Sequence, residues 1–328
     1  MVAMSPHLSR RHFLFQAAVA AAASALPPEN AKPLRGIFII MATPFTEAGA
    51  VDFEDLENEV RWLDRCGVQG IVWPQLASEY MTLSKDERMH GMEVIARAAK
   101  GKRPALVLGV QGANTAAALE YVKHAESLAP DAIIAIPPTE AKTLDDFREY
   151  YRAIAKAAKR PLFMQTTGGA RGIEPTVEFM LELARELPNF RYVKEEYEPV
   201  IERMKQLAEH RDVIHGVFSG AAGKGMMYEM GLGFDGTMPG APYSDVYAQI
   251  WSLYQSGQKE KAREVFSRLL LMLNTEQQIP GTRRYVMKKR GVFKTMVSRR
   301  DKSTLGPEDI REIEIQLEGL RPYFKGWI

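Results

Sequence analysis

The sequence predicts a parallel (β/α)8 barrel, and three observations indicate it. Short apolar or β-branched runs alternate with amphipathic stretches from residue 36 onward, and eight such runs occur. The eight strand and helix pairs take roughly 220 residues, close to the about 250 that this fold typically needs. The first run ends in Ala42-Thr43-Pro44-Phe45-Thr46. A doubly wound open sheet would instead need a glycine-rich phosphate turn at that point.

Each predicted strand is a run of apolar and β-branched residues. In chain order these runs are 36–45, 70–75, 105–111, 132–137, 161–166, 190–196, 213–220 and 233–240. The helical patterns between them include 52–66, 84–100, 115–128, 144–159 and 176–187. Several of these helices open on a Ser, Thr or Asp, the residue types whose side chains cap the first free N–H groups of a helix.

After Ser256-Gly257 the pattern changes to helices alone, at 259–273, 282–290 and 307–317. We therefore expect a barrel over residues 34–257 and a C-terminal helical extension over 258–328. No fixed-period repeat appears in the sequence.

The composition is that of a globular chain with a large core, because 46% of its 328 residues are hydrophobic and 26% are charged. The 43 basic and 41 acidic residues nearly cancel, which argues against nucleic acid as a partner. Cys66 is the only cysteine, so no intrachain disulfide can form. The chain lacks a Cys/His ligand cluster and a His and carboxylate set at the strand ends, so no metal or cofactor is expected.

The N-terminus predicts export. Arg10 and Arg11 precede an apolar, alanine-rich stretch that runs to Leu26, and residues 23–25 offer small side chains for a signal peptidase. We interpret residues 1–25 as a twin-arginine signal peptide and expect a periplasmic or secreted protein. The stretch is too short for a comfortable membrane span, so no membrane association is expected after cleavage.

Lys194 is the main candidate for chemistry. It lies in the short apolar run 190–196, where period-two alternation places Tyr192, Lys194 and Glu196 on one face, toward the mouth of a barrel. Burial disfavours a charged ammonium, and a neutral amine can form a Schiff base with a ketone. The alternative is a structural lysine paired with Glu195 or Glu196 at a strand end.

The order of these signals resembles the dihydrodipicolinate synthase and N-acetylneuraminate lyase family of class I aldolases. The similarity rests on the run 42–45, on Gly109-Val110-Gln111-Gly112-Ala113-Asn114-Thr115, on Val193-Lys194-Glu195, on Ser219-Gly220 and on the closing helices. It implies that Lys194 attacks the carbonyl of pyruvate or a related 2-oxo acid to form an iminium. It also implies a homo-oligomer, a dimer or a tetramer. By the same resemblance, Thr43, Ala77, Ser78, Arg171, Gly220 and Met238 are expected to bind the substrate.

Two departures from the family pattern bear on the reaction. Where the family has a Gly-Thr-Thr-Gly-Glu turn whose hydroxyls bind a carboxylate, this chain has Gln75-Leu76-Ala77-Ser78-Glu79. The carboxylate must then be held by backbone N–H groups, by Ser78 or by other loops. Glu79 keeps the acidic position, either as a catalytic residue or as an acceptor that ties the loop together.

The second departure concerns the proton relay. Gln165 falls where the family has a tyrosine, and an amide cannot act as a general acid or base. Glu196, Tyr192 or a substrate hydroxyl would have to move the proton instead. Two functions therefore remain open: a Schiff-base aldolase or hydratase that uses Lys194 and Gln165, and a barrel that binds a carboxylate or sugar acid without turnover.

Overall fold

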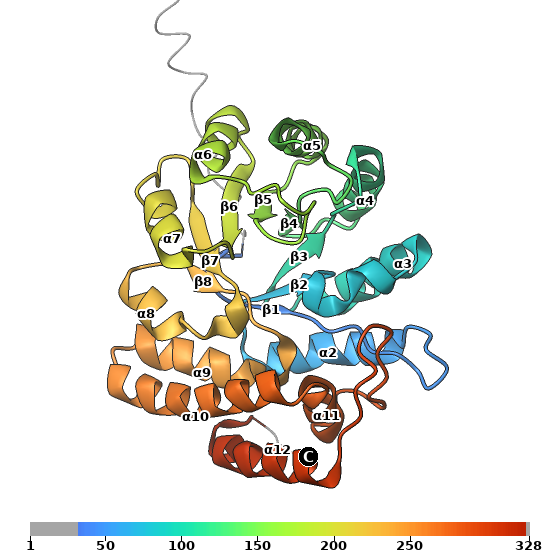
Figure 1. Ribbon diagram of the computed structural model, residues 1–328, viewed down its shortest axis with the longest axis vertical. Coiled ribbons are helices and arrows are strands. Elements are labelled where there is room, and N and C mark those ends of the chain that lie inside the picture. Colours follow the sequence, from blue (N-terminus) through green and yellow to red (C-terminus); the bar gives the residue numbers. More distant parts are fainter. Residues whose placement is uncertain (1–31, 326–328) are drawn as a thin grey trace, which may run out of the picture. The chain divides into compact units, whose positions relative to one another are not determined.

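Eight parallel strands form a closed barrel in the computed structural model, which describes residues 32–325 (Figure 1). Each strand pairs with its neighbours in chain order, and β8 pairs with β1 to close the sheet. The strands are β1 (Gly36–Ile40), β2 (Gly70–Trp73), β3 (Ala105–Gly109), β4 (Ala132–Ala135), β5 (Leu162–Gln165), β6 (Phe190–Glu195), β7 (Gly216–Ser219) and β8 (Gly236–Thr237). The predicted (β/α)8 barrel is confirmed.

Helices surround the barrel, and three further helices at the C-terminal end of the chain pack outside them. The helices that follow the strands are α2 (Phe53–Cys66), α3 (Lys85–Ala99), α4 (Thr115–Ser127), α5 (Leu144–Ala157), α6 (Val177–Glu186), α7 (Val200–Ala208), α8 (Met226–Gly231) and α9 (Ser244–Gln255). Three more, α10 (Lys259–Gln278), α11 (Thr282–Lys289) and α12 (Pro307–Leu320), lie together beside α2 and α9 (Figure 1). The predicted capping residues function as caps: Ser84, for example, accepts the N–H of Glu87 at 3.1 Å.

The strands are shorter than the apolar runs that predict them. The first run extends to Phe45, yet β1 ends at Ile40, and the N–H of Ala42 already donates to the Glu59 carboxylate of α2 at 3.0 Å. Pro44 has no N–H to continue a strand. The residues after Ile40 therefore form a loop at the carboxyl end of the barrel, the end at which sites in this fold are built.

The core has two parts. A large cluster lies between the strands and the helices, and a smaller one fills the barrel with residues such as Phe38, Val107, Phe163 and Phe218. This packed interior leaves room for polar chemistry only at the barrel end.

Two sequence-based expectations concern other parts of the chain. The predicted signal peptide, residues 1–25, lies outside the described residues. Within residues 32–325, no helix combines the length and the apolar character that crossing a membrane would require.

Candidate active site

Lys194 lies inside the barrel near the carboxyl end of β6. Its side chain is 4% exposed, and it stands level with Gln165 of β5 and Phe218 of β7 in the strand register. Below it on the same face, Tyr192 stacks on the Phe163 ring within the barrel filling. The period-two prediction for β6 is confirmed, since Lys194 points inward and is shielded from solvent.

Two polar groups hold the ammonium of Lys194. Its Nζ donates to the Oε1 atom of Gln165 at 3.0 Å and lies 3.1 Å from the Oε1 atom of Glu196. The Gln165 amide is oriented in turn by its Nε2 atom, which donates to the Thr167 carbonyl at 3.4 Å. The Gln165 amide oxygen therefore accepts a hydrogen bond from the amine but cannot act as a base that removes its proton.

Glu196 is placed by two further contacts. Its Oε2 atom accepts the Thr167 hydroxyl at 2.6 Å, and its side chain lies over Gly220 at the end of β7. A Cβ atom on Gly220 would come within 1.9 Å of the Glu196 Oε1 atom. Gly220, predicted to contact substrate, thus makes room for the carboxylate that meets Lys194.

Glu195 faces the opposite way and has a structural environment. It is fully buried, and its Oε1 atom accepts the Thr166 hydroxyl at 2.7 Å and the N–H groups of Glu196 and Tyr197 at 2.9 Å. Its Oε2 atom lies 3.0 Å from the Nε atom of Arg203 on α7. Of the two partners proposed for Lys194 from the sequence, only Glu196 is beside it.

The loop after β2 is braced by its own hydroxyl groups. The Ser78 hydroxyl donates to the Met41 carbonyl at 2.5 Å and accepts the Gln75 N–H at 3.0 Å. Thr43 donates to the Ser78 carbonyl at 2.6 Å and accepts the Trp73 indole N–H at 3.1 Å. Both hydroxyls therefore stabilise the loop, and any contact they make with a substrate stays a prediction.

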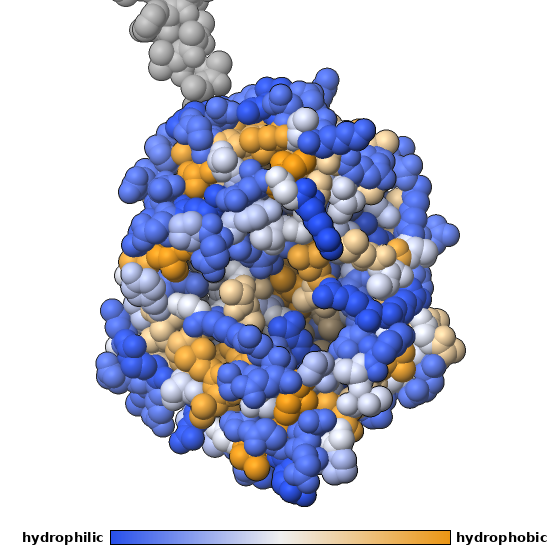
Figure 2. Space-filling model, viewed as in Figure 1, coloured by the Kyte–Doolittle hydropathy of each residue, from blue (hydrophilic) through white to orange (hydrophobic). Residues whose placement is uncertain are grey.

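A cavity of about 560 Å³ opens where this loop meets the C-terminal helices, and the face drawn in Figure 2 is hollowed near its centre. Thr43 and Ala77 line the cavity, whereas Lys194 does not. The charged and amide side chains around it are Glu79, Lys224, Glu276, Gln277, Arg283, Arg284, Arg300 and Asp301. Apolar and polar side chains both line the cavity, which adjoins the loop after β2 that carries Leu76 and Ala77.

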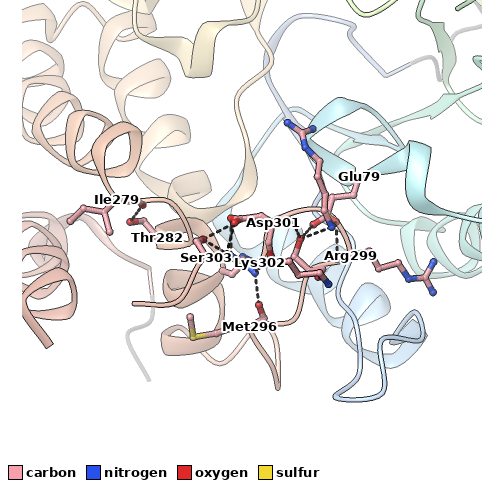
Figure 3. Close-up of polar contacts among 11 residues, drawn as sticks. Glu79, Ile279, Thr282, Met296, Arg299, Asp301, Lys302 and Ser303 are labelled. Carbon is pink, nitrogen blue, oxygen red and sulfur yellow. Dashed lines mark hydrogen bonds and ion pairs between the residues drawn. The ribbon is translucent and has the colours of Figure 1, made fainter. Parts of the chain in front are cut away.

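Glu79 connects the loop after β2 to the C-terminal part of the chain. Its carboxylate accepts the Ser298 hydroxyl at 2.7 Å and the N–H groups of Arg299 and Arg300 at 3.1 and 2.9 Å (Figure 3). The backbone of Glu79 adopts the left-handed conformation, with φ of 56°, which is uncommon for a residue other than glycine. These contacts support the structural interpretation of Glu79.

Arg171 and Met238 lie in contrasting surroundings. Arg171 is exposed on the loop after β5, whose Gly168 approaches Leu76 and Ile136 at the barrel end. Met238 is 2% exposed and packs in the barrel filling. Among residues 32–325, neither side chain forms a hydrogen bond or an ion pair with Lys194, and a role for either in binding remains a prediction.

Sequence reasoning missed the Thr167 hydroxyl and the ring of charged residues around the cavity. Thr167 could have been found, because it directly follows the strand end that carries Gln165. Arg283 and Glu276 on α11 and α10 could not, since no local pattern links them to strand ends about 200 residues earlier.

Comparison with known proteins gives consistent results. The sequence profile of the Dihydrodipicolinate synthetase family matches residues 33–316. A 4-hydroxy-tetrahydrodipicolinate synthase of Chlorobium chlorochromatii is 28% identical over 266 residues, 79% of this chain and 88% of that protein. An L-2-keto-3-deoxyarabonate dehydratase of Azospirillum brasilense is 23% identical over 300 residues, 89% of this chain and 96% of its own. A solved dihydrodipicolinate synthase from Rhodopseudomonas palustris superposes with a TM-score of 0.78 at 21% identity, covering 87% of this chain and 97% of that one.

Proposed function

Because the chain belongs to the dihydrodipicolinate synthetase family, we propose that it is a Schiff-base lyase that acts on pyruvate or a related 2-oxo acid through Lys194. The observation that carries this proposal is the inward lysine. An amine that is 4% exposed, at the carboxyl end of a closed barrel and hydrogen-bonded to an amide, has the placement of a nucleophile.

The proposed chemistry uses the lone pair of the Lys194 amine. Nζ forms a bond to the carbonyl carbon of the 2-oxo acid, and the carbonyl oxygen leaves as water to give an iminium. The positively charged nitrogen then withdraws electrons from the neighbouring carbon, which allows a carbon–carbon or carbon–oxygen bond to break or form. Gln165 orients the amine by its hydrogen bond and takes no part in proton transfer.

The substrate we favour is a 2-keto-3-deoxy sugar acid. Leu76 and Ala77 offer no side-chain donors to a carboxylate, whereas the neighbouring cavity contains Lys224, Gln277 and Arg283, which suit hydroxyl and carboxylate groups of a longer acid. The similarity to a dehydratase that acts on such an acid supports the same choice. Pyruvate, a smaller 2-oxo acid, is the alternative substrate.

The test is turnover. The purified protein is incubated with pyruvate plus an aldehyde, and separately with a panel of 2-keto-3-deoxy sugar acids, while consumption of the acid is followed by chromatography. We expect loss of at least one sugar acid, abolished in Lys194→Arg, which keeps the charge but cannot form the adduct. No consumption across the panel would contradict the proposal.

The second candidate is a binder without turnover, and one observation favours it. Gln165, which does not titrate, stands beside the lysine where the family resemblance places a proton-relaying tyrosine. Ligand-induced thermal stabilisation that persists in Lys194→Ala, together with no turnover in the unmutated protein, would support this reading.

We also propose that the protein is exported and works as a homo-oligomer. The paired Arg10 and Arg11 before an alanine-rich stretch support export, which cell fractionation with and without an Arg10→Lys/Arg11→Lys substitution would test. The family relationship supports a dimer or tetramer, which light scattering on the purified protein would test.

A further inference from the structure

Glu196 stands out among the carboxylates at the barrel end because its partner is the candidate nucleophile. Its Oε1 atom lies 3.1 Å from Nζ of Lys194, and no other cation among residues 32–325 forms an ion pair with it. Glu195, one residue earlier, forms a buried ion pair with Arg203, and its Oε1 atom accepts the Thr166 hydroxyl. The two adjacent carboxylates therefore have different surroundings and are free for different roles.

The position of Glu196 is fixed by residues that follow the ends of three neighbouring strands. Glu196 directly follows β6, and continuation of the period-two alternation puts it above Lys194 on the inward face. The Thr167 hydroxyl, just after β5, donates to its Oε2 atom at 2.6 Å, which leaves Oε1 directed at the amine. Gly220, just after β7, provides the space, since any larger residue would collide with Oε1.

Solvent still reaches this carboxylate. The side chain of Glu196 is 21% exposed, against 4% for Lys194, so the carboxylate lies between the enclosed amine and the open barrel end. A proton acceptor at this boundary can take a proton from the amine and exchange it with water or with a bound ligand.

The other candidate groups are less well placed. Gln165 contacts Nζ but its amide does not titrate. Tyr192 lies deeper, with its ring 6.4 Å from that of His215, which precedes β7. Burial raises the pKa of Tyr192, and the nearby Asp235 carboxylate, which precedes β8, raises it further. Its hydroxyl is thus associated with the amino end of the barrel, away from the amine.

We propose that Glu196 is the general base and acid of the Schiff-base step, a role that rests on the proposed lyase function. The Glu196 carboxylate takes a proton from the Lys194 ammonium, leaving a neutral amine and a carboxylic acid. The amine adds to the substrate carbonyl, and one of its N–H protons moves to the carbonyl oxygen to give a carbinolamine. Glu196 then gives its proton to the carbinolamine hydroxyl, the C–O bond breaks, and water leaves as the C=N bond forms. The carboxylate is regenerated beside a cationic iminium, which it stabilises.

The experiment measures how fast the adduct forms. Protein is mixed with pyruvate, or with a 2-keto-3-deoxy sugar acid, quenched with borohydride at timed intervals and weighed by intact mass spectrometry. The variants are Glu196→Gln, which keeps size and hydrogen bonding but cannot carry the proton, and Glu196→Ala with and without added formate. The matched control is Glu198→Gln, which changes an exposed carboxylate two residues away that accepts the Val200 N–H at 3.2 Å.

We expect Glu196→Gln to form the adduct about 10²- to 10⁴-fold more slowly, the range that positioned proton transfer contributes, while Glu198→Gln matches the unmutated protein. Formate should restore part of the rate in Glu196→Ala by supplying the missing carboxylate. Thermal melts check that each variant is folded.

Other results would overturn the proposal. They distinguish a failure of proton transfer by Glu196 from a failure of the proposed lyase function. An adduct in Glu196→Gln at the unmutated rate would show that the Lys194–Glu196 contact is only a structural ion pair. A slow Glu196→Ala that formate does not accelerate would also contradict proton transfer by Glu196. No adduct in the unmutated protein with any acid would instead remove the lyase function, and this proposal with it.

Discussion

The buried ion pair between Glu195 of β6 and Arg203 of α7 predicts a measurable effect on stability. Arg203→Met should destabilise the protein because Glu195, which is fully buried, would lose the cation 3.0 Å from its Oε2 atom. Breaking a buried pair by removing one partner costs about 3–5 kcal/mol, because an uncompensated charge stays inside. At roughly 2 °C for each kcal/mol in a chain of this size, the melting temperature should fall by about 6–10 °C.

A double-mutant cycle separates the pair from other losses. Arg203 also donates to the Glu174 carboxylate at 2.7 Å and to the Pro175 carbonyl at 2.6 Å, and Arg203→Met removes these contacts too. Glu195→Gln in the same background neutralises the stranded charge. The double variant should therefore melt above Arg203→Met, with a coupling of about 0.5–3 kcal/mol.

Differential scanning calorimetry is the assay, with Lys205→Met as the matched control. Lys205 lies on the same helix and pairs with Glu202 at the surface, so its loss should leave the melting temperature nearly unchanged. A fall of less than about 2 °C in Arg203→Met, or a double variant no more stable than the single one, would show that the buried pair contributes little to stability.

Three further predictions concern the site and its surroundings. Gly220→Ala should slow adduct formation by roughly 10²-fold, because the new Cβ displaces the Glu196 carboxylate from the amine, and timed borohydride quenching measures that rate. Burial raises the pKa of Glu229 from its ordinary value of 4.5 to about 7. The native state then binds a proton that the unfolded state releases, so stability is lost as pH rises from about 4.5 to about 7. Between pH 5 and pH 8 this loss amounts to about 2–3 kcal/mol, which Glu229→Gln should not show in melts at these two pH values. Glu79→Ala should free the segment 298–301 and increase its cleavage in limited proteolysis, because two backbone N–H groups and one hydroxyl lose their acceptor.

Each of these predictions has a contradicting result. Gly319→Ala on α12 is the control for Gly220→Ala, since a Cβ there meets nothing within 4 Å, and equal rates in the two variants would be contrary to the account. Parallel pH dependence in Glu229→Gln and the unmutated protein would exclude a raised pKa. Unchanged cleavage in Glu79→Ala would mean that other contacts hold the segment.

The sequence predicted the barrel and the inward placement of Lys194 because both depend on short-range periodicity. The β-branched runs identify all eight strands, and alternation along residues 190–196 fixes which side chains of β6 point inward. The ends of the strands were less well predicted. Apolar residues continue past Ile40 into the loop at the barrel end, where Phe45 forms an isolated bridge with Val51 instead of extending β1.

The surroundings of the lysine depend on contacts that no local pattern contains. The pairing of Glu195 with Arg203, rather than with Lys194, follows from where α7 packs against β6. The brace between Glu79 and Ser298 joins residues 219 positions apart. Such contacts appear only when the barrel has closed and the C-terminal helices have docked beside it.

Trapping of the adduct shows whether Lys194 is the nucleophile. The protein is incubated with pyruvate or a 2-keto-3-deoxy sugar acid, reduced with borohydride, digested and mapped by mass spectrometry. We expect a mass increase of one reduced acid on the peptide that contains Lys194, and no such increase in Lys194→Arg. An adduct on a different lysine, or a Lys194 peptide that stays unmodified with every acid, would contradict this expectation.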